Sequence, residues 1–402
     1  MTIYSLVSNR NFTEAAALLK EDSKAFENLK NYERNNVVQH CLREKAFDVV
    51  EILLNNNVFN LDLFELDRWS GSFIDAVFVY LPLVINPSGF GSNKSVVADM
   101  TGIDEESLIF FSKVCSRIEN IDEPLEGKTM LDYAISKNIP IPALQVIVDS
   151  GCPANRMDAS ENTLLFKKLQ APIVEWLIGL GLDVNHKNKG QKTPLQNAID
   201  TDQLEVARIL MDNGADASVT NKEGNSLFYT ALVDKVSYTM FDLLCEYNYP
   251  DMTAMNNSGS SLLFNYIDRT CSWDSTELEY LDKLMNMGGD VHQENKTVYG
   301  IQKTPLELSF EKGFEVFERL LEHNSSDINQ ADDNGNTILH KVCAIELNFD
   351  QNKAKDLYKA VKLLLHQGAD ASLRNTQDKS AMDLAIDDNL KEKAVKLLLI
   401  GN

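Results

Sequence analysis

Two short sequence patterns recur along this chain at a spacing of 33 residues. The first pattern is a glycine followed closely by aspartate, and two of its copies, at Gly181 and Gly214, stand 33 residues apart. The second pattern begins with threonine, and its copies at Thr304 and Thr337 have the same spacing. Two independent patterns with one period predict a stack of repeated supersecondary units, because no single unit of this size can bury its apolar face alone.

The order of residue types inside each unit predicts two short helices. A Thr or Ser suits the N-cap, and a proline directly after it, such as Pro194, suits the first turn because no amide hydrogen bond is lost there. A second helix follows with apolar residues three and four positions apart, as between Val206 and Leu210. Glycine then ends the unit in the left-handed conformation that other residues adopt at a cost. Turns with Gly190, Gly224, Gly259, Gly300 or Gly335 lead to the next unit.

These features resemble the ankyrin repeat family. The resemblance is carried by residues 190–224 (GQKTPLQNAIDTDQLEVARILMDNGADASVTNKEG) and by GNTILHKVC and LLLHQGADASLRN within 335–375. It covers residues 127–402 in eight units, the last of which has the features of a C-terminal cap. The resemblance implies an all-α solenoid of stacked helix-turn-helix units with short β-turn tips. It also implies a module that binds other proteins rather than an enzyme, and a structural hydrogen bond from His340 to its helix cap.

Three units depart from the common length. Residues 160–189 lack about three residues near Gln170, so we expect a tightened turn between the two helices of that unit. Residues 259–299 carry an insertion around 269–276, and residues 335–378 carry a longer one around 346–357. Insertions of this kind map to loops, which often hold binding residues. We therefore expect Trp273 to be exposed and to contact a partner, or alternatively to cover a neighbouring helix.

The period blurs over residues 1–126. Residues 12–19 and 37–54 keep helical spacing, and the first unit has the features of an N-terminal cap. We predict degenerate ankyrin-like helices through this region, with a separate small helical domain over 69–126 as the alternative. The predicted domains are therefore 1–126 and 127–402.

Charge and composition narrow the possible partners. The 60 Asp and Glu residues exceed the 38 Lys and Arg residues by 22, so general binding to nucleic acid or to an anionic membrane is disfavoured. The longest apolar run, 73–85, is well short of the ~20 residues that span a bilayer. The start lacks a secretory signal, and the six cysteines are scattered as free thiols would be. We expect a cytoplasmic monomer.

The chain lacks a recognisable catalytic or metal-binding pattern. None of the six histidines forms an HxH or HExxH pattern, and the Gly-Phe-Gly at 89–91 is not followed by the Gly-Lys of a phosphate loop. We predict no cofactor and no metal. An enzyme with an unrecognised site in 64–126 stays a weaker alternative.

The expected binding surface is formed by the turn tips and by the ends of the first helix in each unit, with Trp273 added from its loop. It includes Gln191, Lys192, Asp200, Thr201, Lys222, Glu223, Asn225, Val233, Asp234, Trp273, Glu311, Lys312, Asp333, Asn334, Asn336, Asp387 and Asp388. Acidic residues outnumber basic ones along it, which favours a basic protein partner. Lysine at both 387 and 388 should slow association without unfolding the chain. Two roles stay open: a scaffold, or a dedicated inhibitor of the immunity-protein type that occludes a basic enzyme or toxin.

Overall fold

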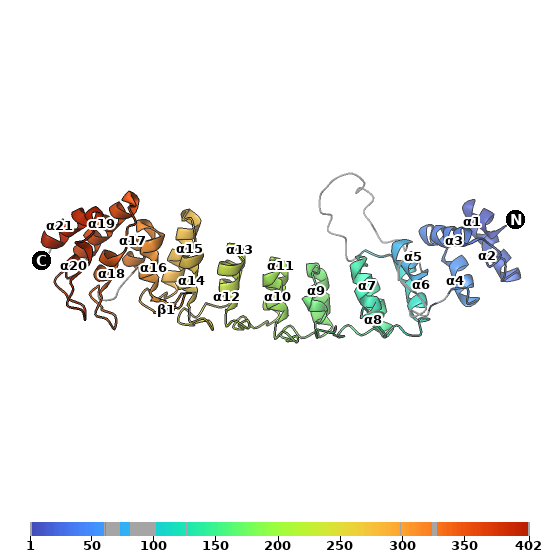
Figure 1. Cartoon of the computed structure of the whole chain (residues 1–402). Helices are drawn as coiled ribbons and strands as arrows, with labels where there is room; N and C mark the ends of the chain where they lie inside the picture. Colours follow the sequence, from blue (N-terminus) through green and yellow to red (C-terminus); the bar gives the residue numbers. More distant parts are fainter. Residues whose placement is uncertain are drawn as a thin grey trace. The chain divides into compact units, whose positions relative to one another are not determined.

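A computed structural model describes residues 2–59, 61, 73–80, 102–124, 127–297, 299–323 and 328–400. The secondary structure of these residues is almost entirely helical (Figure 1). The chain divides into two compact units, residues 1–194 and residues 195–402. Among the described residues, the structure has no helix that is long and apolar enough to cross a membrane.

Unit 1 is built from short helices that pack with the next helix but one. Thus α1 packs on α3, α2 on α4, and α6 on α8, so first helices stack on first helices and second helices on second helices. The elements of this unit are α1 (Ile3–Ser8), α2 (Phe12–Glu21), α3 (Asn31–Arg43), α4 (Phe47–Asn55), α5 (Phe73–Tyr80), α6 (Glu105–Cys115), α7 (Met130–Ser136), α8 (Ile141–Asp149), η1 (Leu164–Phe166) and α9 (Ala171–Gly179).

Unit 2 repeats the same arrangement and adds one pair of very short strands. Here α14 packs on α16, α17 on α19, and α18 on α20. Its helices are α10 (Pro194–Asp200, which begins at the boundary), α11 (Leu204–Asp212), α12 (Leu227–Tyr229), η2 (Thr230–Asp234), α13 (Tyr238–Tyr247), α14 (Leu262–Arg269), α15 (Ser275–Asn286), α16 (Pro305–Lys312), α17 (Phe314–Glu322), α18 (Ile338–Ala344), α19 (Gln351–His366), α20 (Ala381–Ala385), η3 (Asn389–Lys391) and α21 (Glu392–Ile400). The antiparallel strands are β1 (Asn295–Lys296) and β2 (Gln302–Lys303), with Asn295 opposite Lys303.

The predicted all-α repeat fold is confirmed, and its local causes are visible at the helix starts. The Oγ of Thr129, Ser226, Ser261, Thr304 or Ser380 accepts a hydrogen bond from the amide three residues later. This bond satisfies one amide that the first turn would leave without a partner. Small residues then allow close packing, since Ala198 and Ala385 are almost completely buried.

The shortened unit 160–189 does not have the tight turn that we expected. Its first helix is reduced to the single 3-10 turn η1, while residues 167–170 still separate η1 from α9. In the longest unit the insertion extends the second helix, because α19 has 16 residues. The missing residues are thus taken from the first helix and the added ones go largely to the second, since both can change length without disturbing the stack.

Residues 2–59 form two helix pairs, α1–α2 and α3–α4, that stack in the manner of the later units. Of residues 60–126, the structure describes α5, α6 and the segments around α6. The Gly-Phe-Gly at 89–91 and most of the segment 64–101 lie outside the described residues. The domain boundary at 126–127 stays a prediction.

Candidate binding surface

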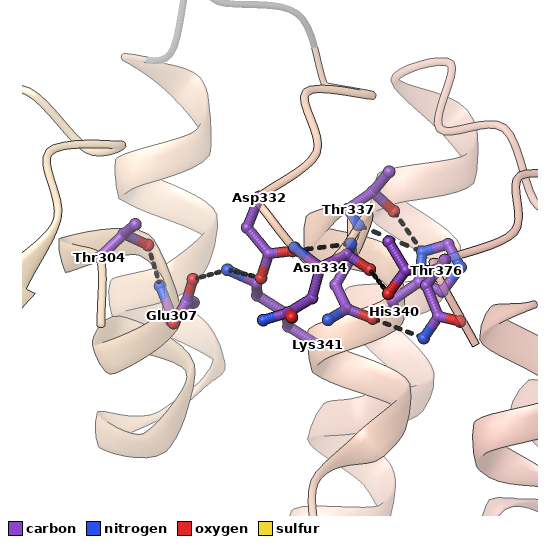
Figure 2. A network of polar contacts seen from close by, with 10 residues as sticks. Thr304, Glu307, Asp332, Asn334, Thr337, His340, Lys341 and Thr376 are labelled. Carbon is purple, nitrogen blue, oxygen red and sulfur yellow. Dashed lines mark hydrogen bonds and ion pairs between the residues drawn. The ribbon is translucent and has the colours of Figure 1, made fainter. Parts of the chain in front are cut away.

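The turns between repeats are held rigid by an Asx residue at their start. In Figure 2, one carboxylate oxygen of Asp332 accepts hydrogen bonds from the amides of Asn334 (2.9 Å) and Asn336 (2.8 Å). Asn221 does the same for the amides of Glu223 (3.0 Å) and Asn225 (2.9 Å). A side chain that closes its own turn replaces water and fixes the tip.

Neighbouring tips are tied to one another by asparagine side chains. The amide nitrogen of Asn375 donates to the side-chain oxygen of Asn336 over 2.8 Å, and Asn256 donates to Asn225 over 3.0 Å. The carbonyl of Asn334 also accepts from the amide (2.9 Å) and the hydroxyl (3.0 Å) of Thr376. The tips therefore form a connected row, and Asn225 and Asn336 use their side chains within the protein.

In most repeats a left-handed backbone position lies two residues before the cap of the first helix. Gly224 and Gly335 occupy it with φ of 76° and 73°. In the turn before Thr193 the left-handed residue is Gln191, with φ of 60°, and Gly190 lies one position too early. Our alignment of Gly190 with the other turn glycines was therefore wrong by one residue, and Gln191 carries a conformation that favours glycine.

The structural role of His340 is confirmed. Its Nδ1 accepts from the amide of Thr337 (3.2 Å) and lies 2.8 Å from the Thr337 hydroxyl. Because Nδ1 is an acceptor, the proton of the neutral ring is on Nε2, which donates to the carbonyl of Lys379 over 3.2 Å. His340 is 1% exposed, so this one ring links a helix cap to the next repeat.

Lys341 makes the second polar link between repeats in Figure 2. Its ammonium bonds to Glu307 of the preceding repeat and lies 3.0 Å from a carboxylate oxygen of Asp332. Burial by itself would lower the pKa of Lys341, but the two carboxylates outweigh it and raise that pKa. Burial would likewise raise the pKa of Asp332, yet the Asn336 amide and the Lys341 ammonium hold it below its usual value.

The structure divides the predicted contact residues by what their side chains already do. Several are exposed and have no side-chain partner among the described residues: Gln191, Lys222, Glu223, Asp234, Asp333, Asn334 and Asp387. Others make bonds inside the protein: Thr201, Asn225, Glu311, Lys312, Asn336 and Asp388. Lys192 and Asp200 also have interactions, and both are half-buried, as is Val233.

Asp388 accepts the amide of Leu390 (2.9 Å) and so caps η3. A lysine at 388 would remove that cap, so the 387/388 substitution is not the clean surface change that we expected.

Trp273 is half-buried, and our expectation of an exposed side chain was wrong. Its ring meets the ring of Tyr266 edge to face, with centroids 6.0 Å apart. The insertion thus folds back on α14, because an indole gains more from covering an aromatic neighbour than from standing in water. This is the alternative role that we gave it.

Three predicted acidic residues influence one another on the first helices of unit 2 and the adjoining turn. Partial loss of hydration, followed by the negative charges of Asp200 and Glu223, raises the pKa of Asp234. The pKa of Tyr229 is raised by burial, by Asp234 and by Asp268. We call Asp200, Glu223, Asp234 and Asp268 the acidic row.

The sequence interpretation missed Asp268 and Tyr229. Asp200, Asp234 and Asp268 follow at steps of 34 residues, so extending the repeat register by one unit would have found Asp268. The surrounding sequence is also acidic, as expected around the acidic row, since residues 195–350 contain 27 Asp and Glu residues and 10 Lys and Arg residues.

Among the residues that the structure describes, no group of three or more His, Cys, Asp or Glu side chains could hold a metal ion. The stacked helix pairs, Asx turns and side-chain links between tips define a helical repeat protein.

The chain contains ankyrin repeats. Residues 164–256 match three copies of the ankyrin repeat, and residues 334–376 match a further copy.

Curated relatives are similar over limited stretches. Human ankyrin repeat and SOCS box protein 6 is 30% identical over 120 residues, which is 27% of this chain and 28% of that protein. A putative ankyrin repeat protein of Rickettsia bellii is 37% identical over 79 residues, 20% of this chain and 11% of that protein. Alpha-latrotoxin-Lg1a of Latrodectus geometricus is 26% identical over 211 residues, 47% of this chain and 14% of that protein. The chain spans less than a third of the length of these relatives.

Two solved structures of ankyrin repeat domains are similar to this chain. The ankyrin repeat domain of Bcl-3 is 21% identical with a TM-score of 0.44, and covers 57% of this chain and 91% of that one. The human ASB11 ankyrin repeat domain is 19% identical with a TM-score of 0.40, and covers 60% of this chain and 98% of that one.

Proposed function

We propose that this chain is a non-enzymatic module that binds a basic segment of a protein partner on the acidic row. Ankyrin repeats are in general protein-interaction modules. The observation that carries the finer proposal is the acidic row itself, in which Asp200, Asp234 and Asp268 recur at one position of successive repeats. Partial loss of hydration, followed by repulsion from the carboxylates of Asp200 and Glu223, raises the pKa of Asp234. A bound lysine or arginine side chain would relieve that repulsion, so the row favours a cationic ligand.

The setting of the row supports recognition of a partner. The exposed Asp234 makes no ion pair with another residue of the described chain, and the nearby Lys235 offsets only part of the charge. Glu223 lies at a tip whose backbone is fixed by Asn221 and Asn257, so little conformational entropy is lost when a ligand binds there. Association should be fast at low salt and should slow as salt screens the row.

The test is capture of partners from the source organism's lysate by tagged full-length protein, with elution in a salt gradient. The variant is Asp200→Lys with Asp234→Lys. The control is Glu318→Lys with Glu322→Lys on α17, which changes the net charge equally at carboxylates that have no partner among the described residues. We expect one basic protein to be retained by the wild type and the control and lost by the variant.

Stoichiometry then separates the two roles. A single partner at one-to-one, released only at high salt, favours an inhibitor or an obligate complex. Several weaker partners that all depend on the row favour a scaffold. Equal retention by the variant and the wild type would refute binding at the acidic row, provided that circular dichroism shows both to be folded.

A further inference from the structure

A cavity of about 340 Å³ lies in unit 1 at the base of two successive turns. It is lined by the start of the repeat at Gly127 and by the turn and cap of the next repeat, residues 153–167. Lys128, Arg156 and Lys167 are among its lining residues, and Met157 and Leu164 supply apolar wall. This volume accommodates an amino-acid side chain and lies at the lower end of the range of about 300–1,000 Å³ for small-ligand pockets.

Unit 2 has a cavity of about 240 Å³ at the corresponding place, around the Lys341 network of Figure 2. The two cavities share their internal ion pair. Lys167 and Lys341 each follow a cap threonine by four residues, and each pairs with the carboxylate three residues after the previous cap, Asp132 or Glu307. The unit 2 cavity therefore serves as a reference, within the same chain, against which the lining of the unit 1 cavity can be compared.

At two corresponding positions the residue of the unit 1 cavity is more positive by one charge. Arg156 stands where unit 2 has Gln330, and Ala159 stands where it has Asp333. The unit 1 cavity therefore has three basic and two acidic lining residues, whereas the unit 2 cavity also contains Glu294 and Asp333.

Both acidic residues of the unit 1 cavity are already engaged. Asp132 accepts from the amide and hydroxyl of Thr129 and pairs with Lys167. Asp158 accepts from the amides of Ser160 (2.8 Å) and Asn162 (2.9 Å), which close the turn.

The basic residues keep unused donors. Arg156 donates one N–H to the carbonyl of Asp122 (2.9 Å), so four of its five guanidinium N–H groups have no partner among the described residues. Lys128 is exposed and makes no ion pair with the described part of the chain. A guanidinium held by one backbone contact and an unpaired ammonium beside it form a receptor for a carboxylate, with charge-assisted hydrogen bonds.

We propose that this cavity binds an acidic side chain, Asp or Glu, from a protein segment. Lys128 and Arg156 contact the carboxylate, and Met157 packs along the aliphatic part of the ligand. The inference rests on the proposed function only in that the ligand is part of a protein. It concerns unit 1, so it stands or falls independently of the acidic row.

The probe is a ten-residue peptide of alternating Glu and Gly, acetylated and amidated so that it has no amine. A carbodiimide activates the carboxylates of the peptide, and a lysine in contact with one of them reacts through its neutral amine, which forms an amide and releases the urea. Mass spectrometry of the full-length protein locates the bonds. The net charge of −22 repels this peptide from most of the surface. We expect coupling to Lys128 to exceed coupling to the exposed Lys168 and Lys187 by about tenfold.

The deciding variant is Arg156→Gln, which leaves every lysine in place. Coupling at Lys128 should fall about tenfold in R156Q, while R156K should keep most of it because the charge is retained. Lys168→Gln, with the same change in charge on the same repeat, should leave Lys128 coupling unchanged. A Gln-Gly peptide should not couple.

Even coupling across the exposed lysines, or unchanged coupling in R156Q, would overturn the proposal. Competition by 10 mM inorganic phosphate that abolishes coupling would also overturn it, because the cavity would then be a general anion site.

If R156Q perturbs the far-ultraviolet circular dichroism, R156K and K168Q carry the test. In that case the inference is refuted if coupling in R156K is spread over the exposed lysines as evenly as it is in a Lys128→Gln protein. The lysine variants at Asp200 and Asp234 should leave Lys128 coupling intact, which separates this test from that of the proposed function.

Discussion

Lys341→Met is the change that most directly tests how the repeats of unit 2 are joined. The side chains of Lys341, Glu307 and Asp332 are 26%, 16% and 17% exposed, so all three are mostly removed from water. Methionine keeps the aliphatic stem but leaves two part-buried carboxylates without their shared cation. Loss of a charged hydrogen-bond partner of this kind costs about 1.5–3 kcal/mol.

The pH dependence of the destabilisation provides a second, independent test of this prediction. The pKa of Asp332 is lowered in the folded protein, so its contribution to stability is present above the unfolded pKa of about 4 and is lost as pH falls through the folded value. The pKa of Lys341 is raised, so its contribution is fully present below the unfolded pKa of about 10 and is lost as pH rises through the higher folded value. The cost of K341M should therefore be full at pH 7 and shrink as pH falls below about 4.

The assay is urea unfolding followed by circular dichroism at pH 7 and at pH 3.5, with hydrogen exchange at α16 and α18 because repeat proteins can unfold in parts. Lys362→Met on α19 is the control, since Lys362 is exposed and has no partner among the described residues. It should change stability by less than about 0.5 kcal/mol. A K341M cost equal to that of the control, or one that does not depend on pH, would refute the network as a link between repeats.

Three further changes test other parts of the structure. His340→Leu should destabilise by about 1–3 kcal/mol by leaving the Thr337 cap and the Lys379 carbonyl unpaired, measured by thermal unfolding; a neutral result would contradict the His340 bridge. Gln191→Gly should stabilise the protein by about 0.5–1 kcal/mol, because φ at this residue is 60°. Gly224→Ala should destabilise it, because a Cβ there would lie 2.7 Å from the side-chain oxygen of Asn257. Thermal unfolding measures both effects. A thiol reagent should modify the exposed Cys271 in the native protein well before Cys343, whose pKa burial raises to about 12; equal rates by mass spectrometry would contradict that burial.

The helix pairs were predictable because their causes are local. A cap hydroxyl such as that of Thr304 meets an amide only three residues away, and the apolar spacing from Val206 to Leu210 selects one face of one helix. The same locality made His340 predictable, since its partner Thr337 lies in the same turn.

The sequence predictions were wrong where a repeat is shorter or longer than the common length. The deficit near Gln170 shortens the first helix to η1, and the insertion near Trp273 folds onto Tyr266. The sequence shows how many residues a repeat lacks or adds. Packing against both neighbouring repeats decides which helix or loop becomes shorter or longer. The one-residue error at Gly190 is of another kind, because this turn has the regular length: Asn188 sets its register as Asn221 does in the next repeat, and the left-handed position then falls on Gln191.

The sequence alone determined the repeat, its period and the class of fold, because each of those follows from contacts within one unit. Only the tertiary structure decided which groups of neighbouring repeats meet: Lys341 with Glu307, Asn375 with Asn336, and Asp234 with Asp200. These partners lie more than thirty residues apart, and their pairing depends on the lengths of every helix and turn between them. The candidate binding groups are of this second kind, since their charge matters only beside neighbours that stacking brings to them.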